Sequence, residues 1–390
     1  MPVRELKPEQ VLERVAAGAR LIDIRAAQER AGGMATPALS IEAPRLHAEL
    51  QRMSADRDTE IILLCQRGTR SQAAGLQLVE SGYRDVASVA GGTQAWREAG
   101  LPMQLPPETA GGLDANALER YSRHLRLPEV GSDGQRRLLD ASVLLVGAGG
   151  LGSPAAFYLA AAGVGRLRIV DDDVVDRSNL QRQILHTDAR VGAGKAQSAA
   201  RTLAALNPTI LIEPVHARLS DANVDALLHG MDVVIDGADN FPTRYLLNAA
   251  CIRHALPLVY GAVHRFEGQV SVFDAGRNRG IAPCYRCLFA MAARDEDAPN
   301  CSEAGVLGVL PGVIGLLQAT EAIKLILGIG EPLSGRLLQF DAMALRFHET
   351  RLAPDPDCPA CGRGPGAGAV TTPSMPTSPI GGGDGCVLIA

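Results

Sequence analysis

Short apolar runs alternate with segments of helical composition along most of the chain. Val143–Val146 is an apolar run that leads into a glycine-rich turn and then into an alanine-rich segment of helical composition. A second apolar run, Leu167–Val170, ends at Asp171. Runs of this length, bounded by turn residues, are typical of buried strands in a parallel sheet. The stretch Ala141–Lys195 therefore predicts a strand, a helix and a second strand in succession.

The alternation continues on the carboxyl side of this unit. The pattern predicts a helix to about Leu206, a strand over Ile210–Val215, a helix over Ala222–Leu228 and a strand over Val233–Asp236. Helices that alternate with buried parallel strands are typical of a Rossmann-like, doubly wound α/β domain. We therefore expect that fold for the larger part of the chain.

The first hundred residues predict a separate, smaller α/β unit. Val3–Ala17 has the pattern of an opening helix, with Pro8–Gln10 at its start. Leu21–Arg25 and Glu60–Leu64 are short apolar runs typical of buried strands. A stretch rich in proline and glycine follows, and such stretches join domains. The end of the chain is too rich in small and polar residues to bury a core. We expect four segments: a first domain over 1–105, a linker over 106–114, a second domain over 115–363 and a disordered tail over 364–390.

The bulk composition narrows the class of protein. A length of 390 residues and a hydrophobic content of 46% support two packed cores. The net charge of -5, with both signs interspersed, gives no basic surface for nucleic acid. The N-terminus lacks the apolar core of a signal peptide. The most apolar stretch, Val306–Gly330, is broken by a proline and two charged residues and predicts one buried helix over Val313–Leu327. We therefore expect a cytoplasmic protein with no nucleic-acid or membrane partner.

The glycine-rich turn predicts a nucleotide site. Its glycines are Gly147, Gly149, Gly150 and Gly152, and they let the backbone approach a phosphate. Asp171, at the tip of the second strand, is placed for ribose hydroxyls. A turn of this kind is by itself typical of dinucleotide sites. A nicotinamide-dependent oxidoreductase is therefore one alternative.

Two cationic side chains and an amide lie in the same stretch as the glycine turn, Ala141–Lys195. They are Asn179, Arg182 and Lys195, and they suit a site that holds a triphosphate and expels pyrophosphate. The chain has 38 lysines and arginines, of which only Lys7, Lys195 and Lys324 are lysines. A lysine beside a glycine turn in so arginine-rich a chain favours a point-charge contact with phosphate. The alternative is a solvated residue at the start of a helix.

Four of the eight cysteines form two CxxC pairs. Cys284 and Cys287 form one pair, and Cys358 and Cys361 form the other. In a chain without an export signal, such pairs indicate metal ligands or redox groups more often than disulfides. Two such turns that meet in space would form a closed tetrahedral thiolate site, which indicates structural zinc. A pair of labile disulfides is the alternative. Cys251 lies in a helical run and is expected to pack in the core.

Cys65 stands where a predicted strand ends and a glycine-containing turn leads into a helix. A sulfur in this position lies over backbone N–H groups and a helix N-terminus, which both favour an anionic sulfur. Arg67 and Arg70 in the same turn add to this effect. We therefore expect Cys65 to be a nucleophile with a low pKa.

From about Leu113 to Gly362 the chain resembles the MoeB/ThiF family of adenylyltransferases, bacterial relatives of the ubiquitin-activating enzymes. The motifs that carry the resemblance are Arg120–His124, the GAGGLG turn, Asp171, Ser178–Gln183, Gly194–Lys195, Asp236–Asn240 and the two CxxC pairs. The resemblance implies ATP as a substrate and a homodimer. It also implies that Asp239 holds Mg²⁺ and that Arg123 reaches across the dimer interface to the phosphates. We expect a helix that begins at Asn116 to carry Tyr121 and Arg123. The alternative is that Arg123 is a surface residue of that helix. Asp236 is expected to cap the turn.

Cys301 belongs to neither CxxC pair. In relatives a cysteine at this place resolves an acyl-persulfide or forms a covalent link to the carrier protein. The alternative, an incidental loop thiol, stays open.

The first unit resembles a single-domain rhodanese. The resemblance is carried by Leu21–Arg25, the CxxGxRS loop that starts at Cys65, and Gly91–Trp96 with Gly100–Pro102. It implies that Cys65 carries a persulfide. The region Gly33–Ala38 lacks the histidine-led turn usual in rhodaneses, which bears on the sulfur donor. A rhodanese-like module that only docks a partner is the alternative.

Together the two resemblances imply an activating enzyme fused to its own sulfurtransferase. The enzyme would adenylate the C-terminal Gly-Gly carboxylate of a small ubiquitin-like sulfur carrier, and the Cys65 persulfide would convert it to a thiocarboxylate. The implied cofactors are ATP, Mg²⁺ and Zn²⁺, and the implied sulfur source is a cysteine desulfurase or thiosulfate. The sequence does not distinguish molybdopterin, thiamine, cysteine, siderophore or tRNA sulfur chemistry.

Overall fold

The computed structural model describes residues 2–30, 33–53, 56–104, 112–290 and 305–362. It divides into two units, Met1–Arg136 and Arg137–Ala390. Most of the expected linker, the expected tail and Cys301 lie outside the described residues. The expected domain boundaries stay a prediction.

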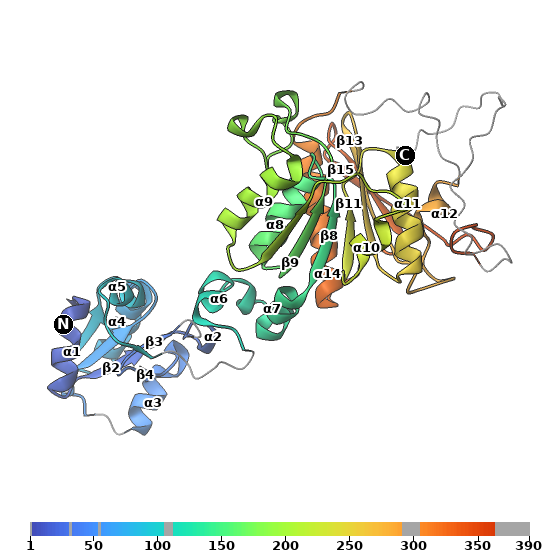
Figure 1. The fold of residues 1–390 in the computed structure, drawn as a ribbon. Helices are drawn as coiled ribbons and strands as arrows, with labels where there is room; N and C mark the ends of the chain where they lie inside the picture. Colours follow the sequence, from blue (N-terminus) through green and yellow to red (C-terminus); the bar gives the residue numbers. More distant parts are fainter. Residues whose placement is uncertain (1, 31–32, 54–55, 105–111, 291–304, 363–390) are drawn as a thin grey trace, which may run out of the picture. The chain divides into compact units, whose positions relative to one another are not determined.

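The first unit is built on a parallel sheet with the strand order β1-β6-β5-β2-β4 (Figure 1). Its strands are β1 Arg4–Leu6, β2 Arg20–Asp23, β4 Leu39–Ser40, β5 Ile61–Leu64 and β6 Val86–Val89. Alternate side chains of β5 enter two separate cores: Ile61 and Leu63 lie in one, and Ile62 and Leu64 lie in the other with Trp96. Strand β5, in the middle of the sheet, is therefore buried on both faces, as its continuous apolar run predicts.

The first five α-helices of the chain lie between the strands of this unit, and two further helices follow its last strand. They are α1 Pro8–Ala16, α2 Ala27–Arg30, α3 Leu46–Arg52, α4 Thr69–Glu80, α5 Gly92–Glu98 and α6 Ala115–Arg120, and α7 Gly131–Asp140 continues into the second unit. Two short strands, β3 Met34–Ala35 and β7 Met103–Gln104, pair with each other. Short 3-10 helices cover Ala43–Arg45 and His124–Arg126.

The opening helix begins at Pro8, and a short strand precedes it. Residues 4–6 form strand β1, which pairs with β6, and helix α1 starts only at Pro8. Proline fits the first turn of a helix because its missing N–H has no helical partner there. The start expected at Pro8–Gln10 is therefore confirmed, and the residues of the expected span that precede Pro8 are not helical.

The second unit contains a sheet with the strand order β10-β9-β8-β11-β12-β13-β14-β15. The strands are β8 Ser142–Val146, β9 Arg166–Val170, β10 Leu211–Val215, β11 Val233–Asp236, β12 Leu258–His264, β13 Glu267–Phe273, β14 Arg336–Asp341 and β15 Arg346–Arg351. The first five strands in this order are parallel, and the last three join them antiparallel. The unit is thus a mixed α/β structure, with the predicted alternation confined to its parallel half.

Helices pack in two groups on the parallel half. α8 Gly152–Ala162 contacts α9 Lys195–Leu206 and α14 Leu310–Leu327, while α10 Val224–Leu228 contacts α11 Phe241–Arg253 (Figure 1). The remaining helices are α12 Tyr285–Leu288 and 3-10 turns over Arg177–Asn179 and Asp188–Arg190. The predicted helix over Ala222–Leu228 is shorter than expected by two residues.

Helix α14 is the apolar helix expected near residue 313. The helix begins at Leu310, three residues before the expected start. Pro311 therefore lies in its first turn, where proline is tolerated because the missing N–H has no helical partner there. By length and composition it is the one helix among the described residues that could cross a membrane, and half of it is buried. It packs against α8 and strands β12 and β13, which is the environment of a core helix.

Candidate functional site

The thiol of Cys65 lies inside a ring of hydrogen-bond donors at the carboxyl end of β5. Its Sγ accepts from the N–H of Gly68 at 3.2 Å, and from the N–H and hydroxyl of Ser71 at 3.4 Å each. Gly68 adopts a φ of +95°, which a residue with a side chain rarely adopts, and begins helix α4. The loop is therefore folded around the sulfur, as the sequence predicts.

These donors lower the pKa of Cys65. Burial acts in the opposite direction and raises it, but the hydrogen bonds from Ser71 and from the backbone of Arg67 and Gly68 outweigh burial. The direction agrees with the expectation from sequence. Ser71 was missed at that stage, although it is the last residue of the CxxGxRS motif and its hydroxyl is a direct partner of the sulfur.

The two arginines of the loop have different environments. The guanidinium of Arg70 donates to both carboxylate oxygens of Glu29, at 2.9 and 2.6 Å. This interaction lowers the pKa of Glu29 to about 2, so the pair is fully ionised at neutral pH. Arg67 is exposed and has no hydrogen bond to another side chain within the described part of the chain. A cavity of about 500 Å³ beside Cys65 is lined by both arginines and by Glu29.

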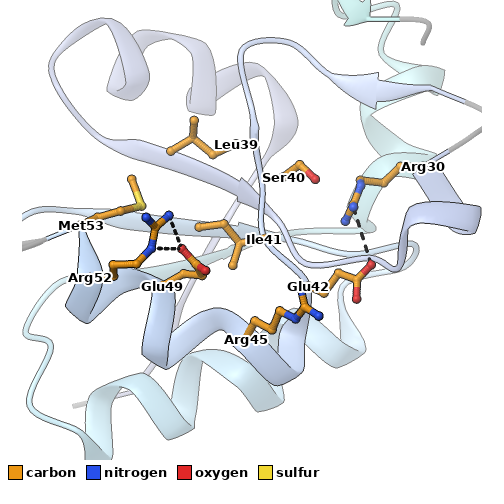
Figure 2. A pocket seen from close by; sticks show the side chains of 9 residues that line it. All are labelled: Arg30, Leu39, Ser40, Ile41, Glu42, Arg45, Glu49, Arg52 and Met53. Atoms are coloured by element: carbon orange, nitrogen blue, oxygen red, sulfur yellow. Dashed lines mark hydrogen bonds and ion pairs between the residues drawn. The ribbon is translucent and has the colours of Figure 1, made fainter.

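A second cavity, of about 430 Å³, lies at the edge strand β4 and holds no predicted site residue. Figure 2 shows its charged rim, in which Arg52 pairs with Glu49 at 2.8 Å and Arg30 with Glu42 at 3.8 Å. Its apolar lining consists of Leu39, Ile41 and Met53. The residues that line the cavity include no thiol, and both of its acids are paired with arginines.

Arg123 lies in the first unit, outside the helix expected from Asn116. Helix α6 ends at Arg120, and Arg123 immediately precedes the 3-10 helix over His124–Arg126. The prediction of one helix that carries Tyr121 and Arg123 was therefore wrong. The expected reach of Arg123 to a nucleotide of a second protomer stays a prediction.

In the second unit, the glycine turn follows β8 and is constrained at both ends. Gly147 has a φ of +94°, and a Cβ placed on it would lie 2.6 Å from the carbonyl oxygen of Gly237. A Cβ on Gly152 would lie 1.9 Å from the carbonyl oxygen of Gly147. A Cβ on Gly149 would meet only Gln183, at 3.6 Å. The outer glycines thus serve the fold, whereas Gly149 leaves space beside the turn for a ligand.

Asp171 links the end of β9 to this turn. Its carboxylate accepts from the N–H of Ala148 at 2.7 Å and from the N–H of Asp173 at 2.9 Å. Burial raises the pKa of Asp171, and these two hydrogen bonds partly offset the increase. The carboxylate lies at the carboxyl end of its strand, where open parallel sheets bind ligands.

Three residues that were predicted to face phosphates lie near the same edge of the sheet. Arg182 donates to Asn179 Oδ1 at 2.5 Å, and a Cβ on Gly150 would lie 3.5 Å from Arg182 Cγ. Lys195, the first residue of α9, forms an ion pair with Asp173 at 2.8 Å. The side chain of Lys195 is only 7% exposed, so it is not a solvated residue at a helix start.

The loop after β11 completes this edge. Gly237 contacts the glycine turn, and the exposed Asp239 follows two residues later. Asp236 is fully buried and accepts from the N–H of Ala238 at 2.9 Å, as expected of a residue that caps the turn. Burial raises the pKa of Asp236 to about 6, against the opposing effect of Arg244, whose guanidinium lies 3.6 Å away. Arg244 also donates to the carbonyl of Ala238 at 3.1 Å and was missed by the sequence analysis.

The four cysteines of the CxxC pairs meet in one cluster. Their sulfurs all lie within 4.8 Å of one another, with separations of 3.7 Å for Cys284 and Cys358 and 3.4 Å for Cys287 and Cys361. Sulfurs around a tetrahedral zinc, about 2.3 Å from the metal, are about 3.8 Å apart. Disulfide sulfurs would be about 2.05 Å apart. The cluster therefore fits four thiolate ligands of zinc and not two disulfides.

The other cysteines are separate from this cluster. Cys251 lies on α11, is buried in the core as expected, and has a pKa raised by burial. Cys301 lies outside the described residues, so its role stays a prediction.

Comparisons with known proteins identify the class to which this fold and these sites belong. Residues 121–360 match the ThiF family, and residues 7–99 match the rhodanese-like domain. The chain therefore belongs to the ThiF family and carries a rhodanese-like domain at its N-terminal end. Both resemblances drawn from the sequence motifs are confirmed.

Two relatives and one solved structure illustrate the match. The chain is 54% identical over 252 residues to the SAMP-activating enzyme E1 of Haloferax volcanii, covering 65% of this chain and 92% of that protein. It is 43% identical over 321 residues to the adenylyltransferase and sulfurtransferase MOCS3-1 of Zea mays, covering 81% of this chain and 67% of that protein. A crystal structure of E. coli MccB with MccA-N7isoASN has a TM-score of 0.53 at 24% identity, covering 62% of this chain and 75% of that one. This last likeness concerns the fold alone.

Proposed function

We propose that this protein adenylates the C-terminal Gly-Gly carboxylate of a ubiquitin-like sulfur carrier and then transfers sulfur to it. The observation that carries the proposal is the pairing, in one chain, of two sites. One is a nucleotide-type edge built from the ends of β8, β9 and β11. The other is a thiol held by a ring of donors. The names of the relatives, which include an adenylyltransferase and sulfurtransferase, support this assignment.

The adenylation site has groups for each part of ATP. The backbone of the glycine turn would approach the phosphates, and Asp171 would bind the ribose. Asn179, which accepts a hydrogen bond from Arg182, would hold that arginine beside the phosphates. Arg182 and Lys195, with Arg123 of a second protomer, would offset phosphate charge. Asp239 would hold Mg²⁺, whose charge stabilises the departing pyrophosphate. The carrier carboxylate attacks the α-phosphorus, its oxygen forms a bond to phosphorus, and the bond to pyrophosphate breaks.

Sulfur transfer uses the activated acyl group. The terminal sulfur of a Cys65 persulfide attacks the acyl carbon, and AMP leaves with the electron pair of the broken C–O bond. The product is an acyl disulfide between the carrier and Cys65. A second thiolate, which we assign to Cys301, attacks the Cys65 sulfur and forms a Cys65–Cys301 disulfide, while the S–S bond to the carrier breaks and the carrier leaves as a thiocarboxylate. An external thiol then reduces the Cys65–Cys301 disulfide before the next turnover. The low pKa of Cys65 favours the thiolate, which is the form that accepts a sulfur atom from the donor and becomes the persulfide.

The remaining parts of the proposal concern structure and partners. The four-cysteine cluster has no open ligand position and would hold a structural zinc ion. The persulfide donor would be a cysteine desulfurase or thiosulfate. We propose a cytoplasmic homodimer, because Arg123 is expected to act across a protomer interface.

Exchange of labelled pyrophosphate into ATP tests the adenylation step. With a recombinant ubiquitin-like carrier that ends in Gly-Gly, the wild-type protein should catalyse exchange. The variant D239N should lose about 100-fold in rate, because it lacks the metal-binding carboxylate. D221N, which changes an exposed aspartate elsewhere, should retain the rate. Reduction of a nicotinamide cofactor without any exchange would instead support an oxidoreductase.

The variant C65A tests the sulfur step separately. It should retain pyrophosphate exchange, because Cys65 takes no part in adenylation, and lose the carrier thiocarboxylate, which mass spectrometry detects as a gain of one sulfur for one oxygen. An unchanged thiocarboxylate yield would show that the rhodanese-like domain only docks a partner.

A further inference from the structure

The ammonium group of Lys195 is buried against a carboxylate that is itself largely in solvent. Lys195 Nζ lies 2.8 Å from Asp173 Oδ2, and the Lys195 side chain is 7% exposed whereas that of Asp173 is 69% exposed. A buried ammonium without a partner is unfavourable, so Asp173 stabilises Lys195 in this position. An exposed carboxylate can be hydrated in place of this contact, so Asp173 can release Lys195 at small energetic cost.

Backbone contacts fix the two residues beside each other. The N–H of Lys195 donates to the carbonyl oxygen of Asp173 at 2.9 Å, and Val174 pairs with Gly194 in an isolated bridge. These contacts do not depend on the side chain of Asp173. A substitution there therefore removes the ion pair and leaves the backbone arrangement in place.

The ion pair is connected to the glycine turn through Asp171. The N–H of Asp173 donates to one oxygen of Asp171 at 2.9 Å, and the other oxygen accepts from the turn residue Ala148 at 2.7 Å. Asp173 thus holds the lysine ammonium next to the place where the proposed function puts the triphosphate.

We propose that Asp173 is a positioning residue that holds Lys195 at the nucleotide site and releases it to the phosphates when ATP binds. This inference rests on the proposed function. A triphosphate carries several negative charges, whereas Asp173 carries one, so the ammonium exchanges its partner when the nucleotide arrives. The ion pair keeps Lys195 in place before ATP binds. Because the pair must break on binding, the free energy of breaking it weakens the affinity for ATP.

The expected sign follows from linkage. D173N removes an interaction that exists only in the nucleotide-free protein, so it destabilises the free state and not the complex. The dissociation constant for ATP with Mg²⁺, measured by calorimetry on the full chain, should fall about three- to fivefold. Thermal unfolding without ATP should begin at a lower temperature in D173N, and saturating ATP should raise it by more than in the wild type.

The neighbouring Asp172 provides a matched control. It is exposed, and the described part of the structure shows no ion pair or side-chain hydrogen bond for it. D172N makes the same charge change one residue away and should leave the dissociation constant unchanged. Adenosine, which has no phosphates, should bind D173N and the wild type equally. A D173N protein that binds ATP more weakly than D172N would overturn the inference.

A double variant shows whether Asp173 acts through Lys195. In a K195M background, D173N should change ATP affinity by less than about 1.5-fold, because the partner is already absent. If D173N changes the ATP affinity of the K195M protein as much as it changes that of the wild type, Asp173 does not act through Lys195. D173S serves as a second variant if D173N fails to fold. If the wild type neither binds ATP nor catalyses exchange, the proposed function fails; if it does both and D173N behaves as D172N, only this inference fails.

Discussion

Cys65 is only 1% exposed, and the pKa of its thiol is nevertheless lower than that of an ordinary cysteine. Burial alone would keep it protonated, and the donors of its own loop reverse that effect. Of these donors the hydroxyl of Ser71 is the only one that a simple substitution removes, because the others belong to the backbone. The loop arginines contribute less directly, since Arg70 is already paired with Glu29.

S71A should raise the pKa of Cys65. The variant loses the hydroxyl donor that lies 3.4 Å from the sulfur, and a hydrogen bond to the thiolate favours the charged form. Because the thiolate is the reactive form, the midpoint of Cys65 alkylation should move to higher pH. Iodoacetamide labelling against pH, followed by peptide mass spectrometry, measures it. T69A, in the same loop but without a contact to the sulfur, should keep the wild-type midpoint, and an identical profile for S71A would contradict the prediction.

At the scale of elements, the glycine turn separates two kinds of constraint. Gly152 begins α8 where a Cβ would overlap the carbonyl of Gly147, whereas Gly149 borders open space. The sequence motif does not show which of these glycines is required for the fold. The contacts that a Cβ would make in the folded chain show that Gly152 is required and Gly149 is not.

G152A should destabilise the second unit, and G149A should not. The 1.9 Å approach in G152A must be relieved by a backbone shift, and overpacking of this kind costs about 1–3 kcal/mol or more. G149A should keep the wild-type unfolding midpoint and bind ATP more weakly, because its methyl group occupies space beside the turn. Thermal unfolding by circular dichroism and ATP calorimetry separate the two effects. A stable G152A that binds ATP normally would refute this account.

Strands and helices with strong apolar patterns could be predicted from sequence, and short edge elements could not. Val233–Asp236 lies in the strand over the same residues as expected, because a run buried on both faces has an unambiguous pattern. Strand β1 was missed because only Leu6 of its three residues is buried, so its pattern is no clearer than that of a helix start. The side-chain partners Ser71, Asp173 and Arg244 were missed because each acts through a contact that only the folded chain creates.

Considered as a whole, the described molecule has separate cores in its two units, and its single tryptophan lies in the first of them. Trp96 is fully buried within the first unit, so its fluorescence reports on that unit alone. Circular dichroism reports on both units. The two signals together can therefore assign a change in stability to one unit.

C358S should remove zinc and destabilise the second unit only. With one of four thiolates lost, metal content by plasma mass spectrometry should fall from about one zinc per chain toward zero. The dichroism transition should move to lower temperature, and the Trp96 transition should stay in place. C251A, which removes a buried thiol outside the cluster, should keep its zinc. Full zinc content in C358S would show that the cluster is not the metal site.

The contact between Gly147 and Gly237 has a consequence for how this protein can change. The two positions are far apart in sequence, and each has almost no room for a side chain because the backbone of the other segment lies against it. No single substitution at one position can be rescued by a substitution at the other, since glycine is already the smallest residue. Efforts to redirect the enzyme toward another nucleotide should therefore vary Gly149 and leave this crossing of two loops intact.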